Sequence, residues 1–173
     1  MSKSVVKHDP AWAKDFILAA DLIEQALGMT CGAVHHIGST SIPDILAKPI
    51  IDILVEVTSL TELDEISFQL RAHGFEAKGE YGISGRRYFR KSRGDGVRTH
   101  HVHMYAIGDD NLRRHIAFRD YLRAHPEVAR EYSDLKAKLN GESATDWNAY
   151  QARKDVFVEA TERNALAWFI GRY

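Results

Sequence analysis

The chain has 173 residues, enough for one domain with a buried core and too few for two domains of ordinary size. Its 23 basic residues nearly balance its 24 acidic ones, so no overall charge marks it as a nucleic-acid or membrane-surface binder, and a local cluster must hold any anionic ligand. We therefore predict a single domain over residues 1–173.

The sequence also predicts a cytoplasmic location. Cys31 is the only cysteine, which excludes an internal disulfide framework. The first seven residues lack the apolar run of a secretory signal, and no stretch approaches the ~20 apolar residues that span a bilayer. We expect no membrane contact. The oligomeric state stays open.

The first predicted elements are a helix, a strand and a loop. Asp9 and Pro10 suit a helix N-terminus, and apolar residues then recur at helical spacing until Gly28 ends the run. The segment 30–37 is short and partly β-branched, as in a strand. Gly38-Ser39-Thr40-Ser41-Ile42-Pro43 follows it and has the composition of a loop.

A second strand is expected over 49–57, because Pro-Ile-Ile-Asp-Ile-Leu-Val-Glu-Val is almost wholly apolar, as in a central strand covered on both faces. Asp52 and Glu56 are its polar exceptions. Ser59 and Glu62 then form a capping-box pattern for one helix that ends near Gly74. A short strand over 75–80 is also consistent with the sequence.

An antiparallel hairpin is predicted next, from strands 86–91 and 97–107 around a turn that contains Asp95-Gly96. Helical spacing then covers the rest of the chain, with two helices meeting near Pro126 and a last helical segment from about Asp146. This order predicts an α+β fold, with a mixed β-sheet, helices packed on it and a helical C-terminal layer.

The loop and Asp52 form the strongest candidate site. Glycine lets the backbone approach a ligand, and the amides and hydroxyls of Ser39, Thr40 and Ser41 can hold phosphate oxygens. A carboxylate inside an apolar strand is costly unless it is paired or coordinates a metal. If the two strands are neighbours, Asp52 lies beside this loop.

At this point a family resemblance becomes specific. The chain carries His-Ile-Gly-Ser-Thr-Ser-Ile-Pro, Ala-Lys-Pro-Ile-Ile-Asp-Ile-Leu-Val, His-His-Val-His, Ala-Phe-Arg-Asp-Tyr-Leu-Arg-Ala-His-Pro and a late pattern of Tyr150, Lys154 and Phe157. These motifs resemble the GrpB family over nearly the whole chain. The resemblance implies a nucleotidyltransferase-like fold, whose motif is a Gly-Ser loop and a strand with two acids one residue apart, plus a third acid on a later strand. In that superfamily the acids hold divalent metal and the nucleotide triphosphate.

One position departs from the superfamily motif. Position 54, two residues after Asp52 on the same strand face, is Leu54 instead of an acid. Glu56 shares that face, but at strand rise it lies about 7 Å further along and cannot simply substitute. Two-metal phosphoryl transfer needs carboxylates beside both ions, so this departure counts against ordinary nucleotidyl transfer.

His101 and His103 lie on one face of their predicted strand, and His100 lies on the other. With Asp52 they suggest a site for one divalent ion (Mg, Mn or Zn), and the nitrogen ligands favour the softer metals. The alternative is that both histidines hydrogen-bond to Asp52 or to phosphate without metal. Of His35 and His36 at most one points into the site, and His115 is interpreted as an ordinary helix residue.

Several basic residues are candidates for holding an anion. Lys48 lies just before the Asp52 strand, and Arg87 belongs to one of the two arginine sets of the hairpin. Arg119 is positioned to reach back over the sheet. We do not expect it to pair with Asp120, because adjacent residues on a helix do not face each other. Lys154 belongs to the late pattern quoted above. The full set predicted to bind a phosphate or nucleotide is Gly38, Ser39, Thr40, Lys48, Arg87, Arg119 and Lys154.

These residues predict binding of a nucleotide or phosphorylated metabolite, with Asp52 as the catalytic carboxylate if nucleotidyl transfer to a small acceptor takes place. Two alternatives stay open: metal-dependent hydrolysis of a phosphoester, and a binding module without catalysis, which Leu54 supports. The resemblance also implies an accessory or folding-assistance role, because GrpB-like domains occur fused to dephospho-CoA kinase.

Overall fold

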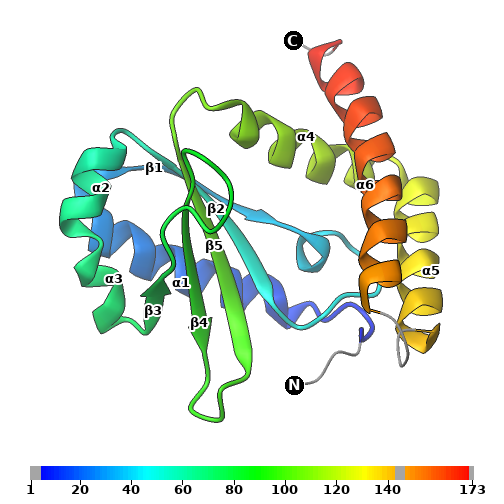
Figure 1. Cartoon of the computed structure of the whole chain (residues 1–173), viewed down its shortest axis with the longest axis horizontal. Coiled ribbons are helices and arrows are strands. Elements are labelled where there is room, and N and C mark those ends of the chain that lie inside the picture. The colour runs from blue at the N-terminus through cyan, green and yellow to red at the C-terminus, as the bar shows by residue number, and fades with distance from the viewer. Residues whose placement is uncertain (1–4, 143–146, 172–173) are drawn as a thin grey trace.

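The computed structural model describes residues 5–142 and 147–171, with no description of the side chains of 139–151. Within these residues it contains a five-stranded mixed sheet in the order β1-β2-β5-β4-β3, with helices packed on it (Figure 1). The strands are β1 Cys31–Ile37, β2 Ile51–Val57, β3 Phe75–Ala77, β4 Arg87–Ser92 and β5 Arg98–Ala106. The predicted α+β class is confirmed, and so is the inner position of the apolar strand β2.

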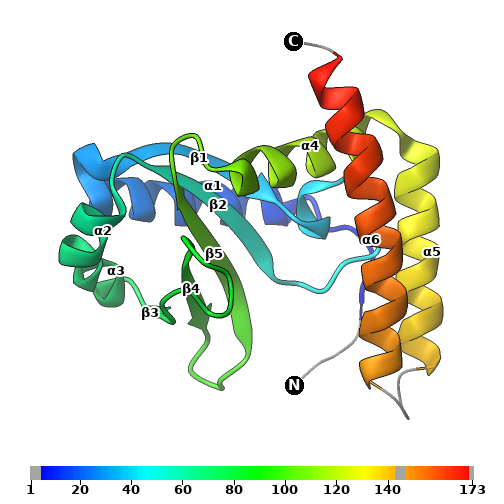
Figure 2. The same ribbon diagram turned by 45° about the horizontal axis from the view of Figure 1, so that its top comes forward.

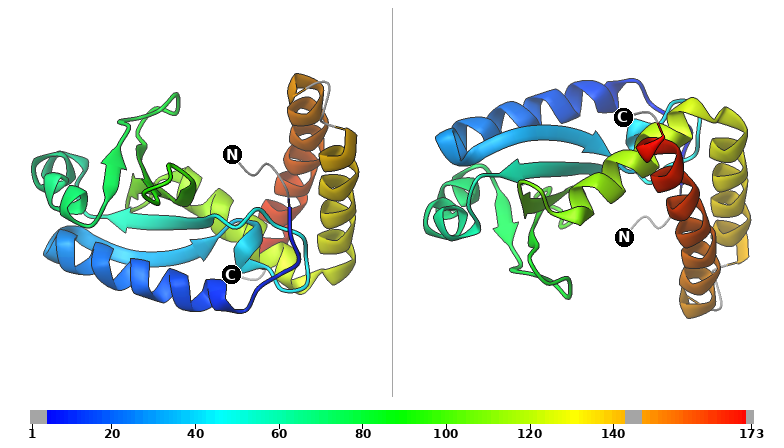
Figure 3. Two further views of the ribbon diagram at one scale, coloured as in Figure 1. Left: turned by 90° about the horizontal axis from the view of Figure 1, so that it is seen from below. Right: turned by 90° about the horizontal axis from the view of Figure 1, so that it is seen from above.

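One face of the sheet is covered by the helices α1 (Ala11–Leu27), α2 (Leu60–Ile66) and α3 (Phe68–Ala72) (Figure 3). Alternate residues of β2, such as Ile53 and Val55, point into this layer and pack with Ile23 of α1 and Phe75 of β3. This is the main hydrophobic core. The burial of these alternate residues in the core explains one half of the apolar run in β2.

Local sequence signals set the ends of these helices. Asp9 Oδ1 accepts a hydrogen bond from Ala11 N at 2.9 Å, as the predicted N-cap requires. Ser59 Oγ accepts one from Glu62 N at 3.2 Å, which is one of the two hydrogen bonds of the predicted capping box. The single helix predicted between Ser59 and Gly74 is divided at Ser67. The Ser67 hydroxyl donates to the carbonyl oxygen of Asp64, a local contact that competes with a continuous helix.

The other face of the sheet is covered only in part. Helix α4 (Asp110–Ala124) lies over one end of it, and α5 (Pro126–Glu142) and α6 (Trp147–Ile170) pack together as the C-terminal layer (Figures 1 and 2). Leu54 of β2 packs with Ile37, Tyr105 and Leu112 in a small cluster under α4. The start predicted near Asp146 for the last helix lies outside the described residues.

The pairing of the strands positions the candidate site. β1 and β2 are antiparallel with Ile37 opposite Asp52, so the loop after β1 begins beside the carboxylate. β2 and β5 are parallel with Asp52 opposite His101, and β4 and β5 form the predicted antiparallel hairpin. Among the described residues, no helix combines the length and the apolar composition needed to cross a bilayer.

Candidate functional site

The Gly38 loop lies directly against Asp52. Gly38 has φ of 70°, and a Cβ built on it would lie 2.4 Å from Asp52 Oδ2, closer than real Cβ atoms approach another group. Only glycine therefore permits this approach of the loop to the carboxylate. A short 3₁₀ turn over Ser39–Ser41 follows, and Ser41 Oγ donates to Gly38 O at 2.7 Å to close it.

His36 supports this loop from the α1 side. Its Nε2 lies 2.9 Å from Thr40 Oγ1, and its ring stacks on Phe16 of α1 with centroids 4.8 Å apart. Burial lowers its pKa to about 4, and the charge of Arg123 contributes to the shift, so the ring is neutral at pH 7. His35 contacts Glu56 at 2.9 Å instead. Both histidines are thus engaged in contacts within the fold.

Asp52 and His101 form a hydrogen-bonded pair. His101 Nδ1 lies 3.2 Å from Asp52 Oδ1. Burial raises the pKa of Asp52, but the hydrogen bond with His101 and nearby positive charges outweigh burial, so the pKa lies below its ordinary value. Asp52 is therefore ionised at neutral pH. For His101, this contact agrees with the alternative in which the histidine hydrogen-bonds to Asp52; His103 has no such contact with Asp52 among the described residues.

The donor set does not fit a preformed site for two divalent ions. Leu54 occupies the position of the second acid and is fully buried in its apolar cluster. His103 Nδ1 lies 3.5 Å from Nη1 of Arg86. The positive charge of this guanidinium would repel a metal cation bound by both His103 and Asp52. Within the described residues, no three His, Cys, Asp or Glu side chains form a group that could hold a metal. Metal binding at Asp52, His101 and His103 therefore stays a prediction.

A cavity of about 660 Å³ opens above the loop and the carboxylate. The sheet forms one wall, and α5 and α6 contribute Lys136, Lys154 and Val158 to another. Most of the residues predicted for the site line this cavity: Gly38, Ser39, Thr40, Lys48, Asp52, His101, His103 and Lys154. The structure brings them together from four separate parts of the chain. The side chain of Tyr150, from the same late pattern as Lys154, lies outside the described residues.

Two predicted anion-binding arginines lie elsewhere. Arg87 donates through Nε and Nη2 to both carboxylate oxygens of Asp64, at 2.6 and 2.7 Å, away from the cavity. Arg119 donates to His36 O at 3.2 Å and so braces the end of β1. It also contacts Asp120 Oδ1 at 2.7 Å, so the expectation that these neighbours do not pair was wrong. A long guanidinium side chain can turn back to the adjacent carboxylate.

Lys136 is a cavity residue that the sequence did not indicate. It belongs to α5, is only 4% exposed, and its Nζ donates to Ser39 Oγ at 2.9 Å and to Leu46 O. Burial lowers its pKa to about 7, and the charge of Lys154 contributes to the shift. The helical period around Lys136 was visible in the sequence, but it did not show that this lysine faces the loop.

His115 is the second residue that the sequence misjudged. Instead of an ordinary helix position, it lines the cavity, and its ring lies 5.6 Å from that of His103. Its helix α4 crosses the sheet face that carries Asp52. Helical spacing alone could not show which face of the sheet α4 covers.

The neutral histidines predict acid sensitivity. Burial lowers the pKa of His36, His100 and His103 to about 4 and that of His115 to about 3, whereas an unfolded histidine titrates near pH 6.5. Between these values the unfolded state binds more protons. The free energy of unfolding should therefore fall as the pH falls from about 6.5 to 4, by up to about 1.4 kcal/mol per pH unit for each histidine.

Urea unfolding near pH 7, pH 6 and pH 5 measures this slope. His103→Gln should give a shallower slope than the unmodified protein, because one of the titrating rings is absent. Equal stabilities near pH 7 and pH 5 would contradict the burial of neutral imidazoles.

Comparison with known proteins adds a family to this geometry. A family model described as "GrpB protein" matches residues 3–164. The chain is 45% identical over 168 residues to the UPF0157 protein YqkA of Bacillus subtilis, covering 97% of the chain and 48% of that protein. It is also 30% identical to a dephospho-CoA kinase of Mycobacterium leprae, over 95% of the chain and 46% of that protein. The chain thus spans about half the length of these two relatives.

Two solved structures are similar in fold. The conserved protein GrpB of Enterococcus faecalis superposes with a TM-score of 0.89 and 40% identity, covering 96% of this chain and 99% of the other. The Cid1 poly(U) polymerase in its MgGTP-bound structure superposes with a TM-score of 0.52 and 16% identity, over 76% of this chain and 42% of the other. The second likeness concerns the fold alone, and it agrees with a nucleotidyltransferase-like architecture.

Proposed function

The chain belongs to the GrpB family, and from this premise we propose that it binds a nucleotide or phosphorylated metabolite in the cavity above Gly38, Ser39 and Thr40. The phosphate groups lie against the loop. Gly38 has no side chain to keep them from the backbone, and the hydroxyls of Ser39 and Thr40 supply hydrogen bonds. Nucleotidyl transfer to a small acceptor, with a divalent metal at Asp52, is the further activity that this site would support.

The observation that carries the proposal is the local concentration of lysines around the loop. Lys48, Lys136 and Lys154 come from three separate segments and line one cavity, although the whole chain has a net charge of −1. Among the described residues no carboxylate lies within ion-pair distance of Lys136. A buried cation without an ionic partner is costly, and a bound phosphate offsets that cost.

The fold is compatible with nucleotide chemistry, because the Cid1 poly(U) polymerase of similar architecture has MgGTP bound in its crystal structure. The buried Leu54 favours a second candidate, a binding domain without catalysis. The dephospho-CoA kinase that contains a matching segment is consistent with such an accessory domain in a larger protein. Binding is common to both candidates, so it is tested first.

Lys136→Met should weaken the binding of inorganic tripolyphosphate about 10- to 100-fold near pH 6, since one charge-assisted hydrogen bond to phosphate is lost. The same binding should weaken in the unmodified protein as the pH rises above about 7, because Lys136 then loses its proton. Calorimetric titration of both proteins across this pH range measures the two effects. Lys138→Met, an exposed lysine on the same helix, is the matched control and should bind as the unmodified protein does.

A thermal-shift screen of nucleotides tests the proposal more broadly. A ligand at a hundred times its dissociation constant stabilises by about 2.7 kcal/mol, which raises the melting temperature by several degrees. Repeating the screen with Mg, Mn and Zn on the unmodified protein and on Asp52→Asn tests the metal separately. If no nucleotide, tripolyphosphate or metal shifts the melting temperature, the proposed function is wrong.

A further inference from the structure

Two stacked tyrosines lie next to the candidate site. The rings of Tyr81 and Tyr88 are 5.0 Å apart and inclined by 19°. Tyr88, on β4, is buried, whereas Tyr81, in the loop before β4, is 59% exposed. The pair therefore presents one aromatic ring to solvent on top of a second ring that is fixed in the sheet.

The backbone of Tyr81 is held in an unfavourable conformation. Its φ is 45°, in the left-handed region that a bulky residue rarely adopts. Arg86 fixes the loop in this state, because its Nη2 donates to Tyr81 O at 2.6 Å and its Nε donates to Glu80 O at 3.1 Å. Arg86 is only 7% exposed, and its guanidinium carbon lies over the Tyr88 ring, 5.1 Å from the ring centre. A buried cation thus fixes an exposed, strained aromatic residue.

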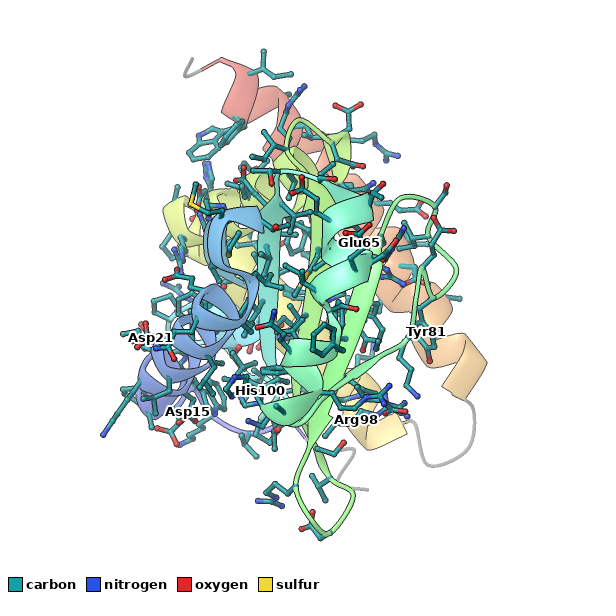
Figure 4. The ribbon with its side chains drawn as sticks, turned by 90° about the vertical axis from the view of Figure 1, so that its left-hand side faces the viewer. Asp15, Asp21, Glu65, Tyr81, Arg98 and His100 are labelled. Atoms are coloured by element: carbon teal, nitrogen blue, oxygen red, sulfur yellow. The ribbon has the colours of Figure 1, made fainter. Side chains whose placement is uncertain are left out.

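This tyrosine pair is linked to the carboxylate through His101. The Tyr88 ring lies 5.7 Å from that of His101, whose Nδ1 contacts Asp52 at 3.2 Å. Figure 4 shows Tyr81 toward the right of the view, and Asp15 and Asp21 of α1 toward the left. Arg98 and His101 also line the cavity. Tyr81 is therefore on the side of the sheet that carries the Gly38 loop.

We propose that the exposed ring of Tyr81 is the stacking surface for a nucleobase, and that the ligand of this site is a nucleotide rather than a phosphorylated metabolite without a ring. The inference rests on the proposed function, because it assigns the phosphates of the same ligand to the loop. Every nucleobase has a face that stacks on an aromatic side chain, whichever base it is. The buried Tyr88 and Arg86 hold the Tyr81 ring in place before a ligand arrives, which lowers the entropic cost of binding.

The test compares ligands with and without a base. The unmodified protein should bind at least one of ATP, GTP, CTP and UTP more tightly than inorganic tripolyphosphate in calorimetric titrations. Tyr81→Ala should weaken that nucleotide about 5- to 150-fold, the range for loss of one base stack, and leave tripolyphosphate within about twofold. Tyr81→Phe keeps the ring and should bind like the unmodified protein. Phe68→Ala removes a similarly exposed aromatic residue from α3 on the other side of the sheet and should change neither ligand.

The outcomes separate the two proposals. If tripolyphosphate binds but no nucleotide binds more tightly, or if Tyr81→Ala binds nucleotide normally, the stacking surface is wrong and anion binding at the loop stands. If neither tripolyphosphate nor any nucleotide binds, the proposed function fails and this inference fails with it. Circular dichroism of Tyr81→Ala checks that the variant is folded. Tyr81→Asn, which tolerates the left-handed conformation and lacks the ring, replaces it if it is not.

Discussion

Leu54→Asp is expected to lower the free energy of unfolding by about 4 kcal/mol or more, and not to complete a metal site. Leu54 is fully buried between Ile37, Tyr105 and Leu112, so the new carboxylate would lie in a mainly apolar cluster away from water. Truncating a buried leucine already costs about 2–5 kcal/mol, and burying a charge adds to this cost. Because domains are stable by only about 5–15 kcal/mol, this loss removes between about a quarter and most of the stability.

Urea unfolding of the two proteins measures the loss. Burial raises the pKa of an unpaired carboxyl group, so the difference between Leu54→Asp and the unmodified protein should shrink as the pH falls toward 4. Leu54→Met, which conserves volume, should cost less than about 1.5 kcal/mol and serves as the control. A folded Leu54→Asp protein that gains stability from Mn or Mg would instead indicate that two acids on β2 can form a metal site.

Gly38→Ala should destabilise the protein by about 2–4 kcal/mol and abolish ligand binding at the loop. Two effects add. An alanine at φ of 70° is strained, and its Cβ would lie 2.4 Å from Asp52 Oδ2 and 2.9 Å from Asp52 Cβ. Relief requires the loop and β2 to separate, which moves both the carboxylate and the loop amides that we propose to bind phosphate.

Thermal unfolding and tripolyphosphate titration of the same preparations test this expectation. For a chain of this size the stated loss lowers the melting temperature by roughly 4–16 °C. Gly94→Ala is the control, because Gly94 lies in the hairpin turn and an added Cβ meets no atom within 4 Å. A Gly38→Ala protein with normal stability and normal binding would show that the contact between loop and carboxylate is not needed.

Local chemistry made the skeleton of this site predictable. The apolar run with one acid identified β2, Asp95-Gly96 identified the hairpin, and the alternation of side chains placed His101 and His103 on one face. The loop is adjacent to Asp52 because a glycine-containing turn follows one strand and the acid lies near the start of the next. The direction in which strand side chains point follows from a period of two, which the sequence displays directly.

Other parts of the site depended on contacts between distant segments. Lys136 reaches Ser39 across 97 residues, and Arg87 is diverted from the cavity to Asp64 across 23. In the sequence, a basic residue that lines the cavity cannot be distinguished from one that pairs with a carboxylate elsewhere, because its charge does not show which partner the fold brings within reach. The left-handed backbone of Tyr81 was likewise not indicated, since the residue at this position is neither glycine nor asparagine.

By itself, the sequence determined the α+β element order, the GrpB family membership, and the loop and carboxylate at the centre of the site. Only the tertiary structure decided which cations surround that centre, that Leu54 belongs to a core cluster, and that Asp52 pairs with His101. The physical reason is that secondary structure follows from short-range periodicity and backbone preference, which are written in neighbouring residues. Burial and charge pairing follow from how the helices α4, α5 and α6 pack on the sheet, and that packing is a property of the whole chain.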